Sequence, residues 1–246
     1  MTTIGIIGNE GRMGQALTQA VAEQGHEYAG GIGKGGDLAA LAARSDVLVD
    51  FSAPSALLNN LEMAAAANVP LVIGTTGLEA GHHSAIDEAA KQIAVLQTGN
   101  TSLGVTLLAH LVREAASRLG DDWDIEIVEM HHRMKVDAPS GTGVLLGEAA
   151  AAGRGIDLAA NAETGRGKLD GGPSGARTKG AIGFASLRGG TVAGEHSVIL
   201  AGEEECITLS HSAQNRMIFA RGAVKAACWI TGKQAGRYTM EQVLNL

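Results

Sequence analysis

The chain has 246 residues, of which 45% are hydrophobic and 18% are charged, and its formal net charge is −7. This composition is typical of a globular protein with one large domain or two modest ones, and it excludes a disordered chain. The net charge disfavours a broad nucleic-acid surface, and the absence of both a basic leader and an apolar run of about 20 residues predicts a cytoplasmic protein without membrane contact.

The first hundred residues alternate short β-rich runs with Ala-rich helical runs, which is the pattern of βα units in a parallel sheet. Strands are predicted over 3–7, 27–32, 47–51, 71–73 and 93–96. Helices are predicted over 13–24, 38–43, 54–67 and 84–91. This order predicts a Rossmann-like, dinucleotide-binding domain over residues 1–101.

The pattern changes after Asn100 and predicts a second domain over residues 102–215. Its predicted helices are 105–119 and 143–152, and its predicted strands are 123–130, 182–187, 196–201 and 206–212. The Gly-rich segment 161–181 is expected to be a long mobile loop. The resulting fold class is α/β with a second α+β domain built on a mostly antiparallel sheet, and a last helix over 217–230 places 216–246 with the first domain.

A glycine turn follows the first strand and has the spacing GxxGxxG. Gly8 permits a tight turn, Gly11 lets the backbone approach a pyrophosphate, and Gly14 lets the helix pack on the strand. The commoner fingerprint would have a glycine at Glu10. A βα turn without a ligand is the alternative. The residues predicted to bind the cofactor here are Gly8, Asn9, Glu10, Gly11, Arg12 and Met13.

The loop after the second strand should carry the residue that contacts the adenosine ribose. An acid there would bind the 2′-hydroxyl of NADH, and a base would accommodate the 2′-phosphate of NADPH. No acid stands between Glu27 and Asp37, and Lys34 is the only charge available. We therefore expect NADPH to be preferred over NADH. The alternative is that Lys34 is simply a solvated side chain.

Two further turns follow the fourth and fifth strands, at the edge where α/β sheets bind ligands. Their backbone amides and hydroxyls are suited to surround a nicotinamide ribose, although each turn taken alone is ordinary. The residues predicted to bind the cofactor here are Gly74, Thr75, Thr76, Thr98, Gly99, Asn100 and Thr101.

The segment 129–143 concentrates the candidate chemistry of the second domain. One histidine of the pair His131 and His132 can supply a proton at neutral pH, and Lys135 supplies a positive charge for a carboxylate. The Ser-Gly-Thr turn that follows begins a helix, whose N-terminal amides favour an anion. Asp137 is expected to orient the loop. A structural role or a metal site is the alternative for the histidines, but no third ligand has recognisable spacing, so no metal is predicted.

These motifs give the chain a close resemblance to the 4-hydroxy-tetrahydrodipicolinate reductase family, also called dihydrodipicolinate reductases, of the diaminopimelate–lysine pathway. The resemblance extends nearly from end to end. It is carried by residues 8–14, 50–52, 74–77, 129–142, 182–188, 194–196 and 219–223.

The resemblance implies an NAD(P)H-dependent reduction of a cyclic imine dicarboxylate to tetrahydrodipicolinate. It implies that His131 and Lys135 are the catalytic acid–base pair and that the second domain binds substrate and forms a homotetramer through its sheet. The residues that it implies for substrate binding are His132, Ser140, Gly141 and Thr142.

Two departures from the family pattern concern the cofactor: the acid after the second strand is missing, and Thr101 stands where a bulky apolar residue is more usual. Two other functions compete with the reductase. A semialdehyde dehydrogenase would need a nucleophilic cysteine, and Cys206, in a predicted strand, is poorly placed for that role. An NADPH-binding regulator would keep the glycine turn but would not need His131 and Lys135.

Overall fold

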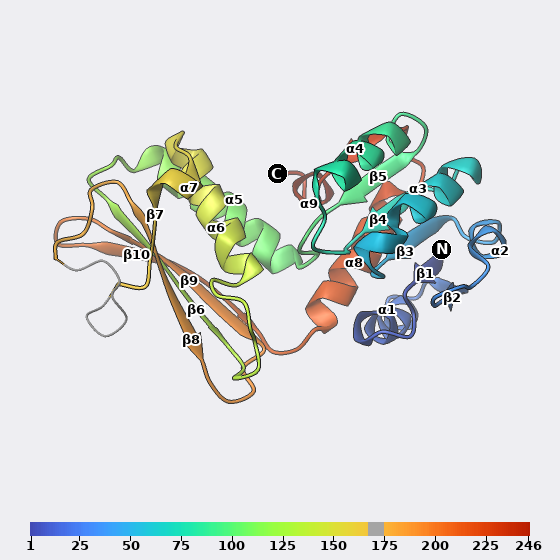
Figure 1. The fold of residues 1–246 in the computed structure, drawn as a ribbon, viewed down its shortest axis with the longest axis horizontal. Coiled ribbons are helices and arrows are strands. Elements are labelled where there is room, and N and C mark those ends of the chain that lie inside the picture. Colours follow the sequence, from blue (N-terminus) through green and yellow to red (C-terminus); the bar gives the residue numbers. More distant parts are fainter. Residues whose placement is uncertain (167–174) are drawn as a thin grey trace. The chain divides into compact units, whose positions relative to one another are not determined.

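The computed structural model describes residues 1–166 and 175–246, and the chain forms two compact units (Figure 1). Unit 1 consists of Met1–Leu103 and Arg216–Leu246, and unit 2 consists of Gly104–Asn215. Within the described residues, no helix combines the length and the apolar character that crossing a membrane requires.

Unit 1 is built on a six-stranded sheet in the order β11-β5-β4-β3-β1-β2, in which every pairing is parallel. The strands are β1 (Thr3–Ile7), β2 (Glu27–Ile32), β3 (Val47–Asp50), β4 (Leu71–Ile73), β5 (Ala94–Gln97) and β11 (Gly236–Tyr238). From β1 the chain proceeds to β2 on one side and then to β3 on the other. The strand order therefore reverses at β1, which is the position where such sheets bind ligands.

Helices cover both faces of this sheet (Figure 1). They are α1 (Arg12–Glu23), α2 (Leu38–Ala42), α3 (Leu57–Ala66), α4 (Ala80–Ala89), α8 (Met217–Ile230) and α9 (Met240–Val243). Apolar residues of α1 and α8 form one core with the sheet, and those of α2, α3 and α4 form the other. Because both faces are covered, the central strand β3 is buried along its whole length.

Several elements of unit 1 differ from the sequence prediction. The helix expected over 54–67 begins as a separate 3₁₀ turn, Pro54–Ala56, before α3. Strand β11 and helix α9 were not predicted, because elements of three and four residues are too short to show a hydrophobic period. Both follow α8, so the C-terminal segment adds a helix to one face of the sheet and a strand to its edge.

Unit 2 is built on a five-stranded mixed sheet in the order β10-β9-β6-β8-β7. Its strands are β6 (Asp124–His131), β7 (Ala162–Thr164), β8 (Ile182–Arg188), β9 (Gly194–Ala201) and β10 (Cys206–Ala213). β9 is antiparallel to β6 and β10, as expected, but β8 is parallel to β6 and β7. The parallel β6–β8 pair arises because the intervening chain crosses over through a helix, so the sheet is mixed and not mostly antiparallel.

The helices in the described residues of this part of the chain are α5 (Leu103–Arg118), α6 (Gly141–Arg154) and α7 (Leu158–Asn161). The side chains of β6 alternate between buried and half-buried. Ile125 and Ile127 pack into the core with residues of α5 and α6. The next two positions on the same face are Glu129 and His131, so the buried face of β6 changes from apolar to ionisable toward the end of the strand.

The segment expected to be a mobile loop, 161–181, is ordered at both ends. It begins in α7 and β7, and Arg177 near its other end donates hydrogen bonds to the carboxylates of Asp124 and Glu126, each at 2.8 Å. Arg177 thereby fixes its part of the segment to β6. Residues 167–174, which also belong to the expected loop, lie outside the described residues.

The packing of α1 gives a stability prediction. A Cβ at Gly14 would lie 2.3 Å from the carbonyl oxygen of Gly8 and 2.4 Å from the Cα of Asn9, both rigid backbone atoms. Gly14→Ala should therefore lower the free energy of unfolding by about 1–3 kcal/mol in urea titrations. Gly81→Ala in α4 is the matched control, because a Cβ there meets nothing within 4 Å, and it should cause no loss. Equal stability of the two variants would contradict this packing.

Candidate functional site

The carboxyl ends of β1, β2 and β3 enclose a cavity of about 580 Å³ in unit 1. Its volume is in the range of small-molecule sites, and it lies where the strand order reverses. The polar or glycine residues that line it are Gly8, Glu10, Gly11, Gly33, Lys34, Gly35, Gly36, Ser52, Ser55, Asn59 and Asn60.

The glycine turn presents backbone at one side of this cavity. Gly8 has a φ of +86°, and a Cβ there would lie 2.7 Å from the carbonyl oxygen of Phe51. Gly11 is the N-cap of α1 and makes no side-chain cap, so the first amides of the helix remain open to an anion. A Cβ at Gly11 would be 3.4 Å from the nearest atom. The fold itself therefore does not demand glycine at that position, whereas a closely approaching ligand would.

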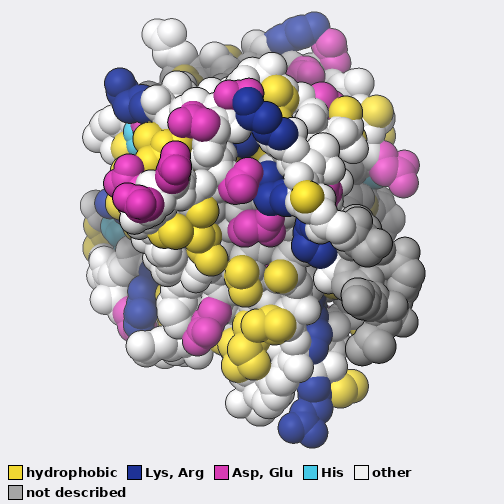
Figure 2. Space-filling view, turned by 90° about the vertical axis from the view of Figure 1, so that its left-hand side faces the viewer, with side chains coloured by type: hydrophobic (Ala, Val, Ile, Leu, Met, Phe, Trp, Pro, Cys, Tyr) yellow, Lys and Arg dark blue, Asp and Glu magenta, His cyan; other side chains and the backbone are white. Residues whose placement is uncertain are grey.

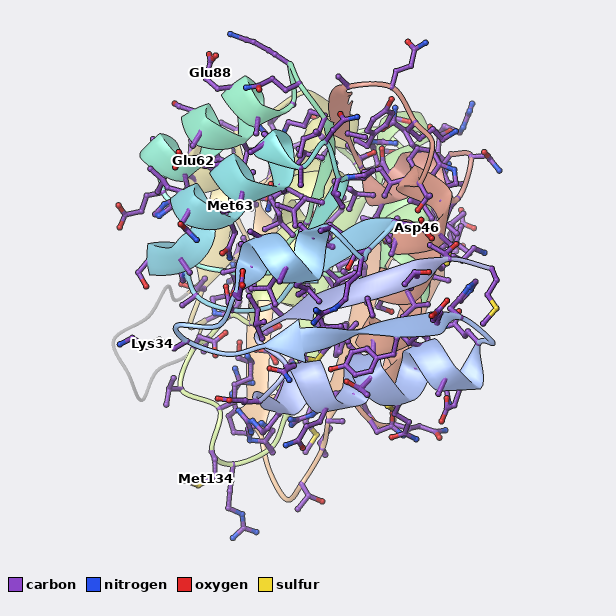
Figure 3. The ribbon with its side chains drawn as sticks, turned by 90° about the vertical axis from the view of Figure 1, so that its right-hand side faces the viewer. Lys34, Asp46, Glu62, Met63, Glu88 and Met134 are labelled. Atoms are coloured by element: carbon purple, nitrogen blue, oxygen red, sulfur yellow. The ribbon has the colours of Figure 1, made fainter. Side chains whose placement is uncertain are left out.

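The other residues predicted at this turn and the next loop have different environments. Lys34 is exposed, and its side chain extends outward from the loop after β2 (Figure 3). Met13 packs against the core, and Arg12 is exposed at the start of α1. Asn9 lies against β2, because a Cβ at Gly31 would be 2.4 Å from the Cβ of Asn9. The structure thus brings Gly8, Glu10, Gly11 and Lys34 to one cavity, and it places Asn9, Arg12 and Met13 beside it.

The turn after β4 is fixed by internal contacts. A Cβ at Gly74 would lie 2.1 Å from the ring of Phe51, so glycine is needed for packing. Thr75 is buried with its hydroxyl 3.4 Å from a carboxylate oxygen of Asp50, whereas Thr76 is exposed. Of the hydroxyls predicted here, that of Thr76 is the one oriented to solvent.

The turn after β5 is also internally bonded. The hydroxyl of Thr98 donates to the carbonyl oxygen of Asn100 at 2.9 Å and accepts from its N–H at 3.1 Å. Thr101 is buried, and its hydroxyl donates to the carbonyl oxygen of Phe219 on α8 at 2.7 Å. Gly99 is exposed. The polar residue at position 101 is therefore satisfied by a partner within unit 1.

Asp50 fixes one wall of the cavity through its hydrogen bonds. No role in binding or catalysis was predicted for it from the sequence. Its side chain is fully buried at the end of β3. It accepts hydrogen bonds from the N–H and the hydroxyl of Ser52, at 2.8 and 2.6 Å, and from the side-chain amide of Asn60 at 3.0 Å. These bonds fix the turn after β3, whose residues line the cavity.

In unit 2, the carboxylate of Glu129 is the centre of a buried polar cluster. Its residue is 1% exposed, and Arg188 binds it through both Nη atoms at 2.8 Å. The Nδ1 of His131 lies 2.6 Å from one oxygen, and the backbone N–H of Ser140 donates to the other at 3.2 Å. One carboxylate therefore joins β6, β8 and the start of α6.

The protonation state of Glu129 follows from these partners. Burial favours its neutral form, but hydrogen bonds with Arg188, Ser186 and His131 outweigh burial and lower its pKa to about 2. The bond with Glu129 in turn raises the pKa of Arg188. An ionised carboxylate can only accept hydrogen bonds, so the Nδ1 of His131 must carry a hydrogen.

His196 is the second buried histidine of the cluster. Its Nε2 lies 3.0 Å from the hydroxyl oxygen of Ser140, which also caps α6 by accepting from the N–H of Gly143 at 3.1 Å. The rings of His196 and His131 meet edge to face, with centroids 5.0 Å apart. Burial, followed by the proximity of His131, lowers the pKa of His196 to about 4, so this histidine is neutral at physiological pH.

Lys135 lies in the turn that follows β6. Its Nζ is 2.8 Å from a carboxylate oxygen of Asp137, and the hydrogen bond from Lys135 lowers the pKa of Asp137. Arg188 also donates to the backbone carbonyl of Asp137 at 2.6 Å, so it connects this turn to Glu129. β6 ends at His131, and His132 is exposed in the turn, so the two adjacent histidines have different environments.

The structure brings some predicted residues of unit 2 together and adds others. His131 and Ser140 belong to the cluster, and Gly141 and Thr142 are the first residues of α6. The contributions of Arg188 and His196 were not predicted. They lie on strands that pair with β6, opposite His131 and Glu129 respectively, and one sequence does not reveal such pairing. The sequence does indicate a role for Glu129. It lies two residues before His131 in a predicted strand, so the two side chains point to the same face.

Among the described residues, no group of three or more His, Cys, Asp or Glu side chains is arranged to hold a metal ion.

The parallel sheet with a glycine-turn cavity at its strand-order reversal, together with a separate unit carrying a buried histidine–carboxylate cluster, defines a dinucleotide-dependent oxidoreductase. Comparison with known families makes this more specific. Models described as dihydrodipicolinate reductase, N-terminus and C-terminus, match residues 2–101 and 104–244. The chain belongs to the dihydrodipicolinate reductase family.

Relatives with the name 4-hydroxy-tetrahydrodipicolinate reductase include one from Zymomonas mobilis that is 52% identical, with 99% of this chain and 97% of the relative covered. Another from Rhodopseudomonas palustris strain HaA2 is 48% identical, with 98% and 96% covered. The solved structure of dipicolinate-bound dihydrodipicolinate reductase from Paenisporosarcina sp. TG-14 is similar in fold, with a TM-score of 0.76, 20% identity and 97% of both chains covered.

The low pKa of His196 predicts how stability depends on pH. Between about pH 6.5 and 4 the unfolded chain binds a proton at this residue that the folded protein does not bind, so stability should fall as the pH is lowered through this window. The contribution to the slope should approach about 1.4 kcal/mol per pH unit. Urea unfolding at a series of pH values should show a shallower slope for His196→Gln than for the wild type. Identical slopes for wild type and His196→Gln would contradict the assignment.

Proposed function

We propose that this chain catalyses the NAD(P)H-dependent reduction of the cyclic imine dicarboxylate 4-hydroxy-tetrahydrodipicolinate (dihydrodipicolinate) to tetrahydrodipicolinate. The family of the chain supports this reaction, which belongs to diaminopimelate and lysine biosynthesis. The observation that carries the proposal for the site is the 2.6 Å bond between Glu129 and His131, which orients a histidine beside the start of α6.

In this proposal, residues 1–101 and 216–246 form the cofactor domain. The open amides at the start of α1 would hold the pyrophosphate, and the loops after β4 and β5 would contact the nicotinamide ribose. A bound nicotinamide would supply the hydride. Lys34 lines the cavity and provides a positive charge suited to a 2′-phosphate, which favours NADPH over NADH.

Residues 102–215 form the proposed substrate domain, with His131 and Lys135 as the acid–base pair. Because the Nδ1–H of His131 is directed to Glu129, its Nε2 is the nitrogen left to exchange a proton with substrate. Lys135 adds positive charge, which is partly balanced by Asp137. A carboxylate of the substrate would replace Asp137 as the partner of Lys135, so that the positive charge of Lys135 would act on the substrate.

The start of α6 would bind one substrate carboxylate. The amides of Gly141 and Thr142 are the first in the helix, where an anion is favoured, and His132 is exposed in the neighbouring turn. The N–H and hydroxyl of Ser140 are already bonded to Glu129, Gly143 and His196. Ser140 therefore contributes by holding the helix start in place.

The sheet of unit 2 offers a surface for the proposed homotetramer. α5 and α6 pack on the face that carries Ile125 and Ile127. The opposite face carries Val128, Met130 and Leu187, of which Leu187 is 50% exposed. Figure 2 shows hydrophobic side chains exposed among charged ones on the surface of unit 2. This exposed apolar part of the sheet face supports self-association, and we propose that the tetramer is cytoplasmic.

The catalytic assignment predicts that His131→Gln loses on the order of 10²–10⁴-fold in kcat, the usual contribution of a positioned acid. Lys135→Ala should also be severely slowed. Both variants should bind NADPH nearly as the wild type does, because the cofactor residues are in unit 1. The test is NADPH oxidation with freshly generated substrate, combined with direct NADPH titration.

Met134→Ala is the matched control for these two variants, because Met134 lies in the same turn and is 77% exposed. It should keep wild-type turnover. Full activity of His131→Gln would remove this residue from the mechanism, and loss of NADPH binding in Lys135→Ala would contradict the division of roles between the domains.

The positioning role of Glu129 gives a separate prediction. Glu129→Gln keeps the shape of the side chain but removes the charge that fixes the Nδ1–H of His131. The kcat should fall on the order of 10²-fold, while NADPH affinity stays unchanged and Glu129→Asp, which keeps the charge, recovers part of the loss. Glu126→Gln is the control, since Glu126 is on the same strand but the other face, paired with Arg177. A wild-type kcat in Glu129→Gln would show that the charge of Glu129 is not needed to position His131.

A further inference from the structure

The geometry points to Glu10 as the residue that binds the ribose 2′-hydroxyl of NADH, a role for which other dinucleotide-binding domains use an acid at the end of the second strand. The inference rests on the proposed cofactor site. In this chain β2 ends at Ile32, Gly33 follows it, and no acid occurs between Glu27 and Asp37. The acid has to come from another element.

The carboxylate of Glu10 occupies the space that a side chain at position 33 would fill. A Cβ built on Gly33 would lie 2.6 Å from the Cδ of Glu10 and 2.7 and 2.8 Å from its two oxygens. Among the described residues, the three nearest heavy atoms to this Cβ all belong to Glu10. The carboxylate of Glu10, in the glycine turn after β1, therefore lies at the end of β2, where the strand itself has no acidic residue.

Glu10 and Gly33 line the same cavity, together with Gly8 and Gly11 of the turn. Within residues 1–166 and 175–246, the carboxylate of Glu10 has no hydrogen-bond or ion-pair partner, so both of its oxygens remain available as acceptors. A ribose hydroxyl is a donor, and a hydrogen bond to a charged acceptor is among the stronger kinds.

Positions 10 and 33 of this chain each carry the residue type that is common at the other position. The commoner glycine fingerprint has a glycine where this chain has Glu10, and the end of β2 commonly has an acid where this chain has Gly33. Exchanging the two residue types keeps one carboxylate and one glycine at this corner of the cavity. A side chain at position 33 would displace the carboxylate of Glu10 from the place that it occupies here.

Glu10 and Lys34 would act on the cofactor in opposite directions. Both line the cavity, and Lys34 extends outward from the loop after β2 (Figure 3). A 2′-phosphate is attracted by Lys34 and repelled by Glu10, whereas a 2′-hydroxyl donates to Glu10. Glu10 thus maintains binding of NADH and limits the preference for NADPH that Lys34 provides.

Calorimetric titration of the full chain with NADH and with NADPH tests this assignment without turnover. In Glu10→Gln the Kd for NADH should rise about tenfold, and the ratio of the NADH to the NADPH Kd should rise at least as much. Glu62→Gln removes the same charge from the exposed side of α3 and should leave the ratio unchanged. A ratio in Glu10→Gln within twofold of the wild type would overturn the assignment.

A second variant moves the carboxylate back to the strand. The double change Glu10→Gly with Gly33→Asp removes the overlap and should recover the NADH affinity that Glu10→Gly alone loses. No recovery would argue against a ribose contact at this corner. If the wild type bound neither nucleotide, the proposed cofactor site would fail together with this inference. If it bound both, with the ratio insensitive to Glu10, only this inference would fail.

Discussion

The buried carboxylate of Glu129 is the interaction on which the organisation of unit 2 depends. A charge that is 1% exposed is tolerated only when it is paired and hydrogen-bonded, and the bidentate bond from Arg188 meets that requirement. Once held, the carboxylate fixes His131 on β6 and the N–H of Ser140 at the start of α6. Arg188 extends the same constraint to the turn that carries Lys135. The proposed acid, the proposed anion-binding start of α6 and the proposed lysine are all positioned by one ion pair.

Unit 1 depends on a different constraint. The backbone of the turn after β1 must pass close to the start of α1 and to the turn after β3, at the point where the strand order reverses. Gly14 makes room for the backbone of Gly8, and Gly8 makes room for the backbone of Phe51. Hydrogen bonds to Asp50 fix the turn after β3. The resulting cavity is lined by glycines, small polar side chains and several apolar ones. Its charged groups are Glu10 and Lys34, and we propose that they determine which dinucleotide is bound.

The sequence predicted much of this fold because the βα units of unit 1 have strong periodic patterns and recognisable turn residues. It could not predict β11 or the parallel β6–β8 pair, because both depend on contacts between segments distant in the chain. The same limit applies to the site. His131 and Lys135 are visible as a local motif, but Arg188 and His196 join them through strand pairing. The proximity of Glu10 to Gly33 likewise requires two loops to be placed in space.

The ionised carboxylate of Glu129 fixes the hydrogen of His131 on Nδ1. The most direct measurement is the pair of imidazole ¹⁵N chemical shifts of His131 in histidine-labelled protein at neutral pH, assigned by comparison with His131→Gln. We expect a protonated Nδ1 with a fixed, non-averaged shift. An unprotonated Nδ1, or shifts averaged between the two tautomers as in free imidazole, would contradict it.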